Sequence, residues 1–180
     1  MMLTVVDTLN RLADAIVDLF QDKHLRYSAP GEPAVVAELY VRLRERFPEY
    51  QVHNEYDRRD RAVKDLSHPD TAGNMHEANV VPDLIVHRIG RQDCNLLVVE
   101  VKRHVNRNYA KDIWKLSGFT DQGGRYAYAV GVHLVINIPA SKVEHADVYI
   151  HGAIDAEVTQ WFGGHLNRLV CHQDEDDPAA

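Results

Sequence analysis

Apolar side chains recur at helical spacing in two segments near the start of the chain. The first segment begins after Thr4, which forms a capping-box-like start with Asp7, and runs to about Lys23. Its apolar positions are Val5, Leu9, Leu12, Ile16 and Leu19. The second segment covers residues 34–47 and stops before Pro48, with apolar positions Val36, Leu39, Leu43 and Phe47. Both patterns predict amphipathic helices, which a turn-rich break over residues 26–33 separates.

Two apolar runs in the middle of the chain predict a β-hairpin. Residues 81–87 and 96–102 each have the pattern of a buried strand, and the sequence Gly90-Arg91-Gln92-Asp93 between them is typical of a turn. Ahead of the hairpin, residues 50–56 predict a first strand. Residues 58–80 are polar and contain Pro69 and Gly73, so they predict a long loop, and loops of that length are usually functional or mobile.

The remaining segments alternate between helix and strand. A third helix is predicted to end near Gly123, with apolar positions Tyr109, Ile113, Leu116 and Phe119. Residues 126–138 predict a long strand, residues 143–150 a last strand, and residues 158–162 some edge structure. A hairpin followed by a helical crossover and another strand predicts an α/β fold, in which helices pack on a mixed β-sheet. We expect a single domain over residues 1–172 and an acidic, disordered tail over residues 173–180.

Charge and composition restrict the classes of function. The formal net charge is −7, whereas proteins that bind DNA usually present a basic surface. Four of the negative charges lie together in the tail, at residues 174–177, and carboxylates in a metal site are neutralised by the metal. No run approaches the ~20 apolar residues of a membrane span, and the start of the chain lacks signal-peptide character. The two cysteines, Cys94 and Cys171, form no metal-ligand spacing, which favours a reduced, cytoplasmic setting.

The predicted hairpin brings two carboxylates together. If its loop is centred between Arg91 and Gln92, Asp83 lies directly opposite Glu100, with Cβ atoms roughly 4.5–5.5 Å apart. Lys102 shares the face of Glu100, because side chains alternate along a strand. Two carboxylates at that distance repel each other unless a cation lies between them. The hairpin therefore predicts a divalent-metal site with a neighbouring lysine, a combination suited to phosphodiester hydrolysis.

These residues resemble a known family. Pro82-Asp83, followed by Glu100-Val101-Lys102 at the end of an apolar strand, is similar to the motif of the PD-(D/E)xK nuclease superfamily. The resemblance covers residues 32–138 and implies a restriction-endonuclease-like core, a mixed β-sheet flanked by helices, with a helix before the first strand. It also implies a nuclease that depends on Mg²⁺ or Mn²⁺, an endonuclease acting on DNA, which leaves a 5′-phosphate and a 3′-hydroxyl.

The resemblance also assigns roles to individual residues. Asp83 and Glu100 would bind the metal, with the carbonyl of Val101 as a third donor. Lys102 would orient the attacking water or stabilise the charge that develops on the phosphorus centre. Glu38, on the helix before the first strand, matches the position of a glutamate that binds a second metal in such nucleases.

Each assignment has a purely structural alternative. Asp83 after Pro82 also fits a turn at the entry to a strand. Glu100 and Lys102 also fit a buried ion pair, and Glu38 a solvated residue paired with Arg42 one helical turn later. Glu55, at the end of the predicted first strand, competes with Glu38 for a place near the site.

Two groups of basic residues fit either a nucleic-acid contact or an ordinary surface. Lys111 and Lys115 are one turn apart on the third helix and either contact a phosphate backbone or form a solvated face. The cluster in the long loop, which comprises Arg58, Arg59, Arg61 and Lys64, has the same two interpretations. The eleven histidines show no zinc-site spacing, and His87 and His133 are expected to be packed or surface residues.

Two classes of function remain open, beside the possibility that the motif is coincidental in a plain α/β binding protein. The first is a nuclease whose partner is nucleic acid. The second is a catalytically silent module of the same fold that binds nucleic acid or assists assembly, for which the acidic charge argues. Homodimerisation, or a partner protein that delivers the substrate, is compatible with either class. Loss of divalent-metal binding on replacement of Asp83 by alanine would count against a coincidental motif, and retention would favour it.

Overall fold

The computed structural model describes residues 3–59, 62–69 and 75–174. The helices are α1 (Val5–Gln21), α2 (Lys23–Ser28), α3 (Glu32–Arg46), α4 (Ala110–Thr120) and α5 (Ala156–Asp174), with one short 3-10 turn, η1 (Gln92–Cys94). The strands are β1 (Gln51–Asn54), β2 (Arg58–Arg59), β3 (Ala62–Val63), β4 (Asp65–Pro69), β5 (Met75–Asn79), β6 (Leu84–His87), β7 (Leu97–Arg103), β8 (Val130–Asn137), β9 (Lys142–Ile150) and β10 (Ala153–Ile154). The fold is α/β, as the sequence predicted.

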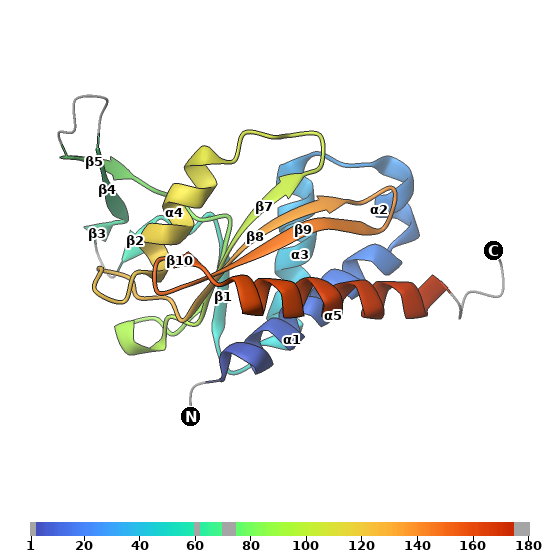
Figure 1. The fold of residues 1–180 in the computed structure, drawn as a ribbon, viewed down its shortest axis with the longest axis horizontal. Helices are drawn as coiled ribbons and strands as arrows, with labels where there is room; N and C mark the ends of the chain where they lie inside the picture. Colours follow the sequence, from blue (N-terminus) through green and yellow to red (C-terminus); the bar gives the residue numbers. More distant parts are fainter. Residues whose placement is uncertain (1–2, 60–61, 70–74, 175–180) are drawn as a thin grey trace.

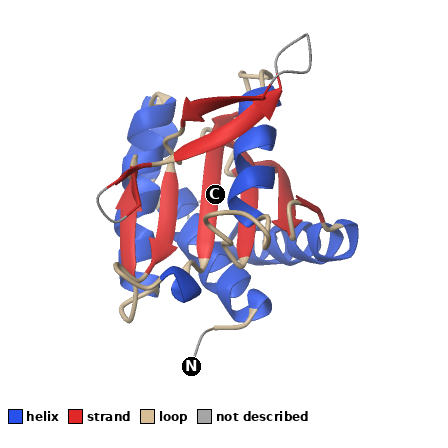
Figure 2. Ribbon diagram, turned by 90° about the vertical axis from the view of Figure 1, so that its left-hand side faces the viewer, coloured by secondary structure: helices blue, strands red, loops and turns tan. Residues whose placement is uncertain are grey.

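A six-stranded mixed sheet forms the centre of the protein, in the order β1-β6-β7-β8-β9-β10. Strands β7 and β8 are parallel and are joined through α4, whereas the other neighbouring pairs are antiparallel. Figure 1 shows α4 over one face of this sheet, with α1, α3 and α5 on the other side, and Figure 2 shows the strands as a layer with helices on both sides. The predicted hairpin and helical crossover are therefore both present.

The larger hydrophobic core lies between the sheet and helices α1, α3 and α5. The Thr4 hydroxyl accepts a hydrogen bond from the Asp7 backbone N–H at 3.1 Å and caps α1, as predicted. Leu9, Leu12 and Ile16 then point from α1 into this core and are fully buried. Each such side chain stabilises the fold by roughly 1.5–3 kcal/mol relative to an exposed position.

A smaller core lies on the opposite face of the sheet, under α4. Leu116 and Phe119 of α4 pack there against Ile85 and Val98 of the hairpin. The absence of a side chain at Gly131 of β8 allows α4 to approach closely, because a Cβ at that position would lie 2.9 Å from Thr120 Cγ2. This close approach brings the polar residues of α4 down onto the sheet.

Three predictions about local structure were wrong. Residues 58–80 are not an irregular loop, because the described part forms two antiparallel strand pairs, β2 with β3 and β4 with β5. Residues 158–162 belong to α5 rather than to edge structure, since Phe162 and Leu166 bury one helical face in the larger core. Helix α5 also includes the first two residues of the predicted tail, Gln173 and Asp174, whereas residues 175–180 lie outside the described chain.

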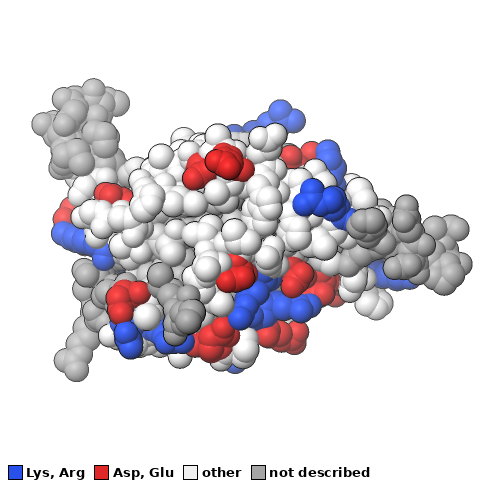
Figure 3. Space-filling model, turned by 60° about the horizontal axis from the view of Figure 1, so that its bottom comes forward, with Lys and Arg blue, Asp and Glu red and all other residues white. Residues whose placement is uncertain are grey.

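Several surface charges of opposite sign form ion pairs. On the face that Figure 3 presents, Lys and Arg side chains lie beside Asp and Glu side chains, without a continuous basic area. Arg46 pairs with Asp18 at 2.5 Å, Arg11 with Glu49 at 2.8 Å, and Arg42 with Asp22 at 3.2 Å. Within the described residues, no helix has both the length and the apolar character needed to cross a membrane.

Candidate metal centre

The register of the hairpin aligns polar residues across the α4 face of the sheet. Leu84 pairs with Val99, so the next position places Asp83 opposite Glu100, as the sequence predicted. Glu100 is in turn the partner of His133 on β8. An otherwise apolar sheet thus carries a row of titratable side chains at one level.

Glu100 is fully buried and incompletely satisfied. Its side chain has no exposed surface, and its Oε1 atom has no hydrogen-bond partner among the described residues. Burial, together with the nearby Asp83 carboxylate, raises the pKa of Glu100 well above its usual range. A buried carboxylate with an unpaired oxygen is costly unless a cation or a proton compensates it.

Asp83 is partly buried and is held by the backbone of the facing strand. Its Oδ2 atom accepts a hydrogen bond from the Val101 N–H at 2.8 Å. Burial raises the pKa of Asp83, although this hydrogen bond and the ammonium groups of Lys115 and Lys102 act in the opposite direction. Because the N–H and C=O of one strand residue point toward the same neighbour, the Val101 carbonyl is also directed toward the Asp83 side.

Lys115 of α4 is the partner of Glu100, which the sequence did not reveal. Its Nζ atom donates to Glu100 Oε2 and, at 3.0 Å, to the carbonyl of Val81. Lys115 is buried, so it forms neither a solvated face nor a phosphate-contact face with the exposed Lys111. The spacing of residues along the helix could not show that Lys115 is buried, and it could not assign a partner on another strand.

Lys102 occupies a different ion-pair network at the end of β7. Its Nζ atom lies 2.8 Å from Glu32 Oε1 and 3.3 Å from Asp112 Oδ2. Burial by itself would lower the pKa of Lys102, but these two carboxylates outweigh it and raise the pKa, so the ammonium stays protonated at neutral pH. The Glu100–Lys102 ion pair that the sequence left open as an alternative does not form; the pairs are Glu100–Lys115 and Lys102–Glu32.

Asp112 of α4 connects the two lysines to His133. Its Oδ2 atom is 3.8 Å from His133 Nε2, and its Oδ1 atom is 3.9 Å from Lys115 Nζ. Burial favours the neutral carboxyl group, but His133, Lys102 and Lys115 together outweigh burial and lower the pKa of Asp112. Asp112 is therefore an anion between the ammonium groups of Lys102 and Lys115, and the sequence did not identify it.

The two other glutamates weighed from the sequence have distinct positions. Glu38 pairs with Arg42 through a 2.7 Å contact, which is the structural alternative that the sequence left open. The glutamate that α3 brings to the centre is Glu32, at the first turn of the helix, and not Glu38. Glu55 lies next to the site through its backbone, because its N–H donates to the Asp83 carbonyl at 3.0 Å, while its side chain is exposed.

One member of the basic cluster of residues 58–64, Lys64, is buried and so does not belong to a basic surface patch. The Lys64 side chain is buried and donates to the Tyr56 carbonyl at 2.9 Å, with its ammonium 4.7 Å from the centre of the Tyr56 ring. Burial lowers the pKa of Lys64 to about 8. Arg61 lies outside the described residues.

His87 is packed, as expected, and lies beside a second histidine. His53 Nδ1 and His87 Nε2 are 2.9 Å apart, so one ring donates a hydrogen bond to the other. Burial, with smaller contributions from His53 and Lys64, lowers the pKa of His87 to about 4. Both rings are neutral at pH 7, and these two residues form a structural hydrogen bond between β1 and β6.

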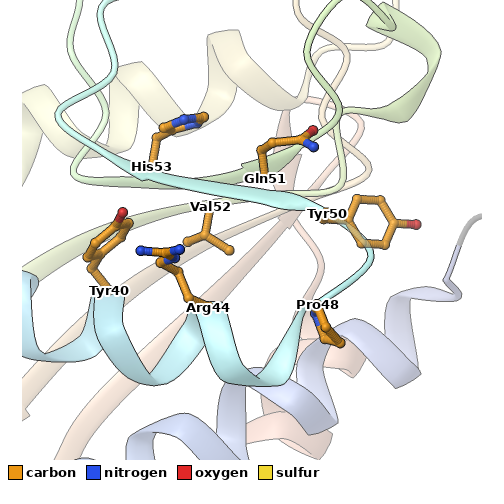
Figure 4. Close-up of a pocket in the computed structure, with 7 residues that line it drawn as sticks. All are labelled: Tyr40, Arg44, Pro48, Tyr50, Gln51, Val52 and His53. Atoms are coloured by element: carbon orange, nitrogen blue, oxygen red, sulfur yellow. The ribbon is translucent and has the colours of Figure 1, made fainter.

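A surface cavity of about 450 Å³ between α3 and β1 presents aromatic and basic groups. Figure 4 shows Tyr40 and Arg44 projecting from α3 toward β1, where Val52 points back at them, while His53 projects from the other side of the strand and Tyr50 lies at its start. The Arg44 guanidinium lies 5.7 Å from the Tyr40 ring centre, and that of Arg88 lies 4.8 Å from the Tyr50 ring centre. Single-stranded nucleic acids are bound on surfaces that combine such rings and cations.

The donors at the centre suit a small, oxygen-preferring cation. Two carboxylates and a backbone carbonyl are the ligands that Mg²⁺ and Mn²⁺ favour, and Mg²⁺ takes few protein ligands while it keeps several waters. Glu100 Oε1 has no partner among the described residues, and the pKa values of both carboxyl groups are raised. Both features are expected where the protein does not fully balance the negative charge of its own carboxylates, as in a cation site.

The fold and this centre define an α/β protein with a buried carboxylate–lysine pair at the middle of the central strand β7. Comparison of the chain with models of known protein families found no match, and neither did comparison with curated proteins or with solved structures.

Proposed function

We propose that this protein is a metal-dependent phosphodiesterase, an endonuclease that acts on DNA and uses Mg²⁺ or Mn²⁺. One observation carries the proposal. Glu100 is fully buried with one oxygen that has no hydrogen-bond partner among the described residues, and it faces a second carboxylate, Asp83, across the hairpin. The resemblance to the PD-(D/E)xK nuclease superfamily supports the same assignment, and so does the order of helices and strands around the hairpin.

The residues have separate tasks in this proposal. Asp83, Glu100 and the Val101 carbonyl would hold the metal, which lowers the pKa of a bound water and withdraws charge from the scissile phosphate. Lys102 provides a protonated ammonium that stabilises the charge developing on that phosphate. Glu32 and Asp112 hold this ammonium in position, and Lys115 neutralises Glu100.

The cavity between α3 and β1 supports nucleic acid as the substrate class, because the Arg44 guanidinium and the rings of Tyr40 and Tyr50 line it. The acidic net charge favours either a partner protein that delivers the substrate or a homodimer that supplies a second surface. A cytoplasmic location fits a chain with two unpaired cysteines, Cys94 and Cys171.

A catalytically silent module of the same fold is the alternative, and a specific contact favours it. Lys115 already compensates Glu100, so the carboxylate can persist in the core without a metal. In that case the centre only joins α4 to the sheet, and the protein binds nucleic acid or a partner without hydrolysis.

The discriminating experiment is calorimetric titration of Mg²⁺ and Mn²⁺ into the wild type and into Asp83→Ala, with a nicking assay on plasmid and on single-stranded DNA in the same buffers. The nuclease predicts that the wild type binds metal and cuts DNA, and that the variant loses both. Glu38→Ala is the matched control, since its carboxylate pairs with Arg42, and it should retain both properties. Absence of metal binding and of cleavage in the wild type would favour the silent module.

A further inference from the structure

We propose that His133, His145 and Asp147 form a second site, which binds a divalent transition metal of the zinc class. It differs in ligand chemistry from the carboxylate centre, because it offers two imidazoles and one carboxylate. Such a set selects Zn²⁺, Co²⁺, Ni²⁺ or Fe²⁺, whereas Mg²⁺ prefers oxygen donors alone. The proposal does not depend on nuclease activity.

The sheet itself brings the three residues together. His133 on β8 is directly opposite Asp147 on β9. His145 is two residues from Asp147 on the same strand, so both project from the same face. One ligand atom from each residue lies within 4.8 Å of the other two, and His145 Nε2 is 3.9 Å from Asp147 Oδ2.

These distances require only a modest adjustment to hold an ion. Donors placed 2.0–2.2 Å from Zn²⁺ in a tetrahedron are about 3.4 Å apart, so the three atoms must close by roughly 1 Å. The side chains of His145 and Asp147 are 37% and 33% exposed, which leaves them room to rotate. His133 is fixed by packing and would be the rigid ligand.

His133 gives an independent indication of a missing partner. The side chain is 1% exposed, and its Nε2 atom has no hydrogen-bond partner among the described residues. Buried imidazole nitrogens are normally satisfied. Asp112 Oδ2 lies 3.8 Å from that nitrogen, which is too far for a hydrogen bond, so the nitrogen stays unsatisfied among the described residues.

The site is enclosed on one side and open on the other. The Tyr109 ring packs edge-on against both imidazoles, with ring centres 4.9 Å from His133 and 5.5 Å from His145. On the open side, His145 and Tyr109 also line a cavity of about 400 Å³, together with His104 and Arg107. Three protein ligands beside a cavity leave a coordination position for water or a small ligand, as in catalytic rather than structural zinc sites.

The test uses the full chain without a histidine tag, stripped of metal and titrated with Zn²⁺ by calorimetry and with Co²⁺ by visible absorption. The wild type should bind one ion per chain, with the absorption bands of Co²⁺ in a site of low coordination number. His145→Ala and Asp147→Asn should each weaken binding by more than about 10-fold, since even the partners of metal ligands contribute 10–100-fold. Both residues are half-exposed, so neither substitution should prevent folding.

Two controls separate this site from other histidines and from the carboxylate centre. His24→Ala removes an exposed histidine of α2 and should leave Zn²⁺ affinity unchanged. Asp83→Ala should also leave it unchanged, whatever its effect on Mg²⁺. Equal Zn²⁺ affinity in the wild type and in His145→Ala would overturn the proposal, and so would loss of Zn²⁺ binding in Asp83→Ala or the absence of stoichiometric binding in the wild type.

Discussion

Lys115 of α4 forms a buried ion pair with Glu100 of β7, and both side chains lie on the side of the sheet that α4 covers. The pair fixes the distance between the helix and the strand at the level where Asp83 and Lys102 also lie. A negative charge on Glu100 is therefore compensated by one residue of another element.

Replacement of Lys115 by methionine should strongly destabilise the protein in the absence of metal. The substitution keeps much of the side-chain volume but leaves the Glu100 carboxylate buried without a partner, which costs about 3–5 kcal/mol. Urea denaturation at pH 7 measures this loss. Lys111→Met, on the exposed side of the same helix, should change the free energy of unfolding by less than about 0.5 kcal/mol. A small effect at Lys115 would mean that Glu100 is protonated in the native protein.

Replacement of Lys102 by methionine should separate metal binding from cleavage, if the protein is the proposed nuclease. The variant should bind Mn²⁺ with an affinity close to that of the wild type, because Asp83 and Glu100 remain. Cleavage should fall by roughly 10²–10³-fold, since a charge directed at the transition state is lost. Arg103→Met alters the neighbouring residue on the opposite face of β7 and should cut at a rate near that of the wild type. Unimpaired cleavage in Lys102→Met would remove this lysine from the mechanism.

The two glutamates of α3 should respond differently to the same change. Glu32→Gln removes the charge that holds the largely buried Lys102 ammonium, and we expect a loss of about 1–2 kcal/mol in unfolding free energy. Glu38→Gln affects a pair on a helix surface and should cost about 0.5 kcal/mol or less. Chemical denaturation of both variants measures the difference. The opposite ranking would show that Glu38, and not Glu32, is the important carboxylate of α3.

The buried His87 should make the protein sensitive to mild acid. Its pKa is about 4 in the folded chain and ~6.5 in the unfolded chain, so the unfolded chain takes up the proton first as the pH falls. Its contribution to stability is therefore present above about pH 6.5 and is lost progressively toward pH 4, by about 1 kcal/mol per pH unit. Below pH 4 the loss is complete.

Melting temperatures at pH 7 and pH 5 test this dependence. The decrease between the two values should be smaller for His87→Gln than for the wild type, because glutamine does not titrate and can still hydrogen-bond to His53. His24→Gln, at an exposed position of α2, should show the wild-type decrease. An identical decrease in all three proteins would mean that His87 keeps a normal pKa.

The hairpin shows how far local sequence can predict a site. The distance of Asp83 and Glu100 from a turn of known composition fixed their register, and alternation placed Lys102 on the face of Glu100. These inferences need only the period of a strand and the position of its loop. The structure has the same register.

The ion pairs of the centre could not be predicted from local sequence. Glu32, Asp112 and Lys115 reach the centre from two helices whose axial position on the sheet no local pattern encodes. The approach of α4 depends on the missing side chain at Gly131 and on packing of Leu116 and Phe119. The sequence favoured Glu38 over Glu55 and did not identify Glu32, because spacing along α3 does not reveal which turn lies beside Lys102.

The sequence by itself thus determined the α/β class, the main helices, the hairpin and its pair of facing carboxylates, because these follow from periodicity and turn chemistry within short segments. Only the tertiary structure decided which lysine compensates which carboxylate, that residues 158–162 are helical, and that His133 meets His145 and Asp147. Each of these depends on contacts between segments distant in the chain, where packing rather than local preference sets the geometry.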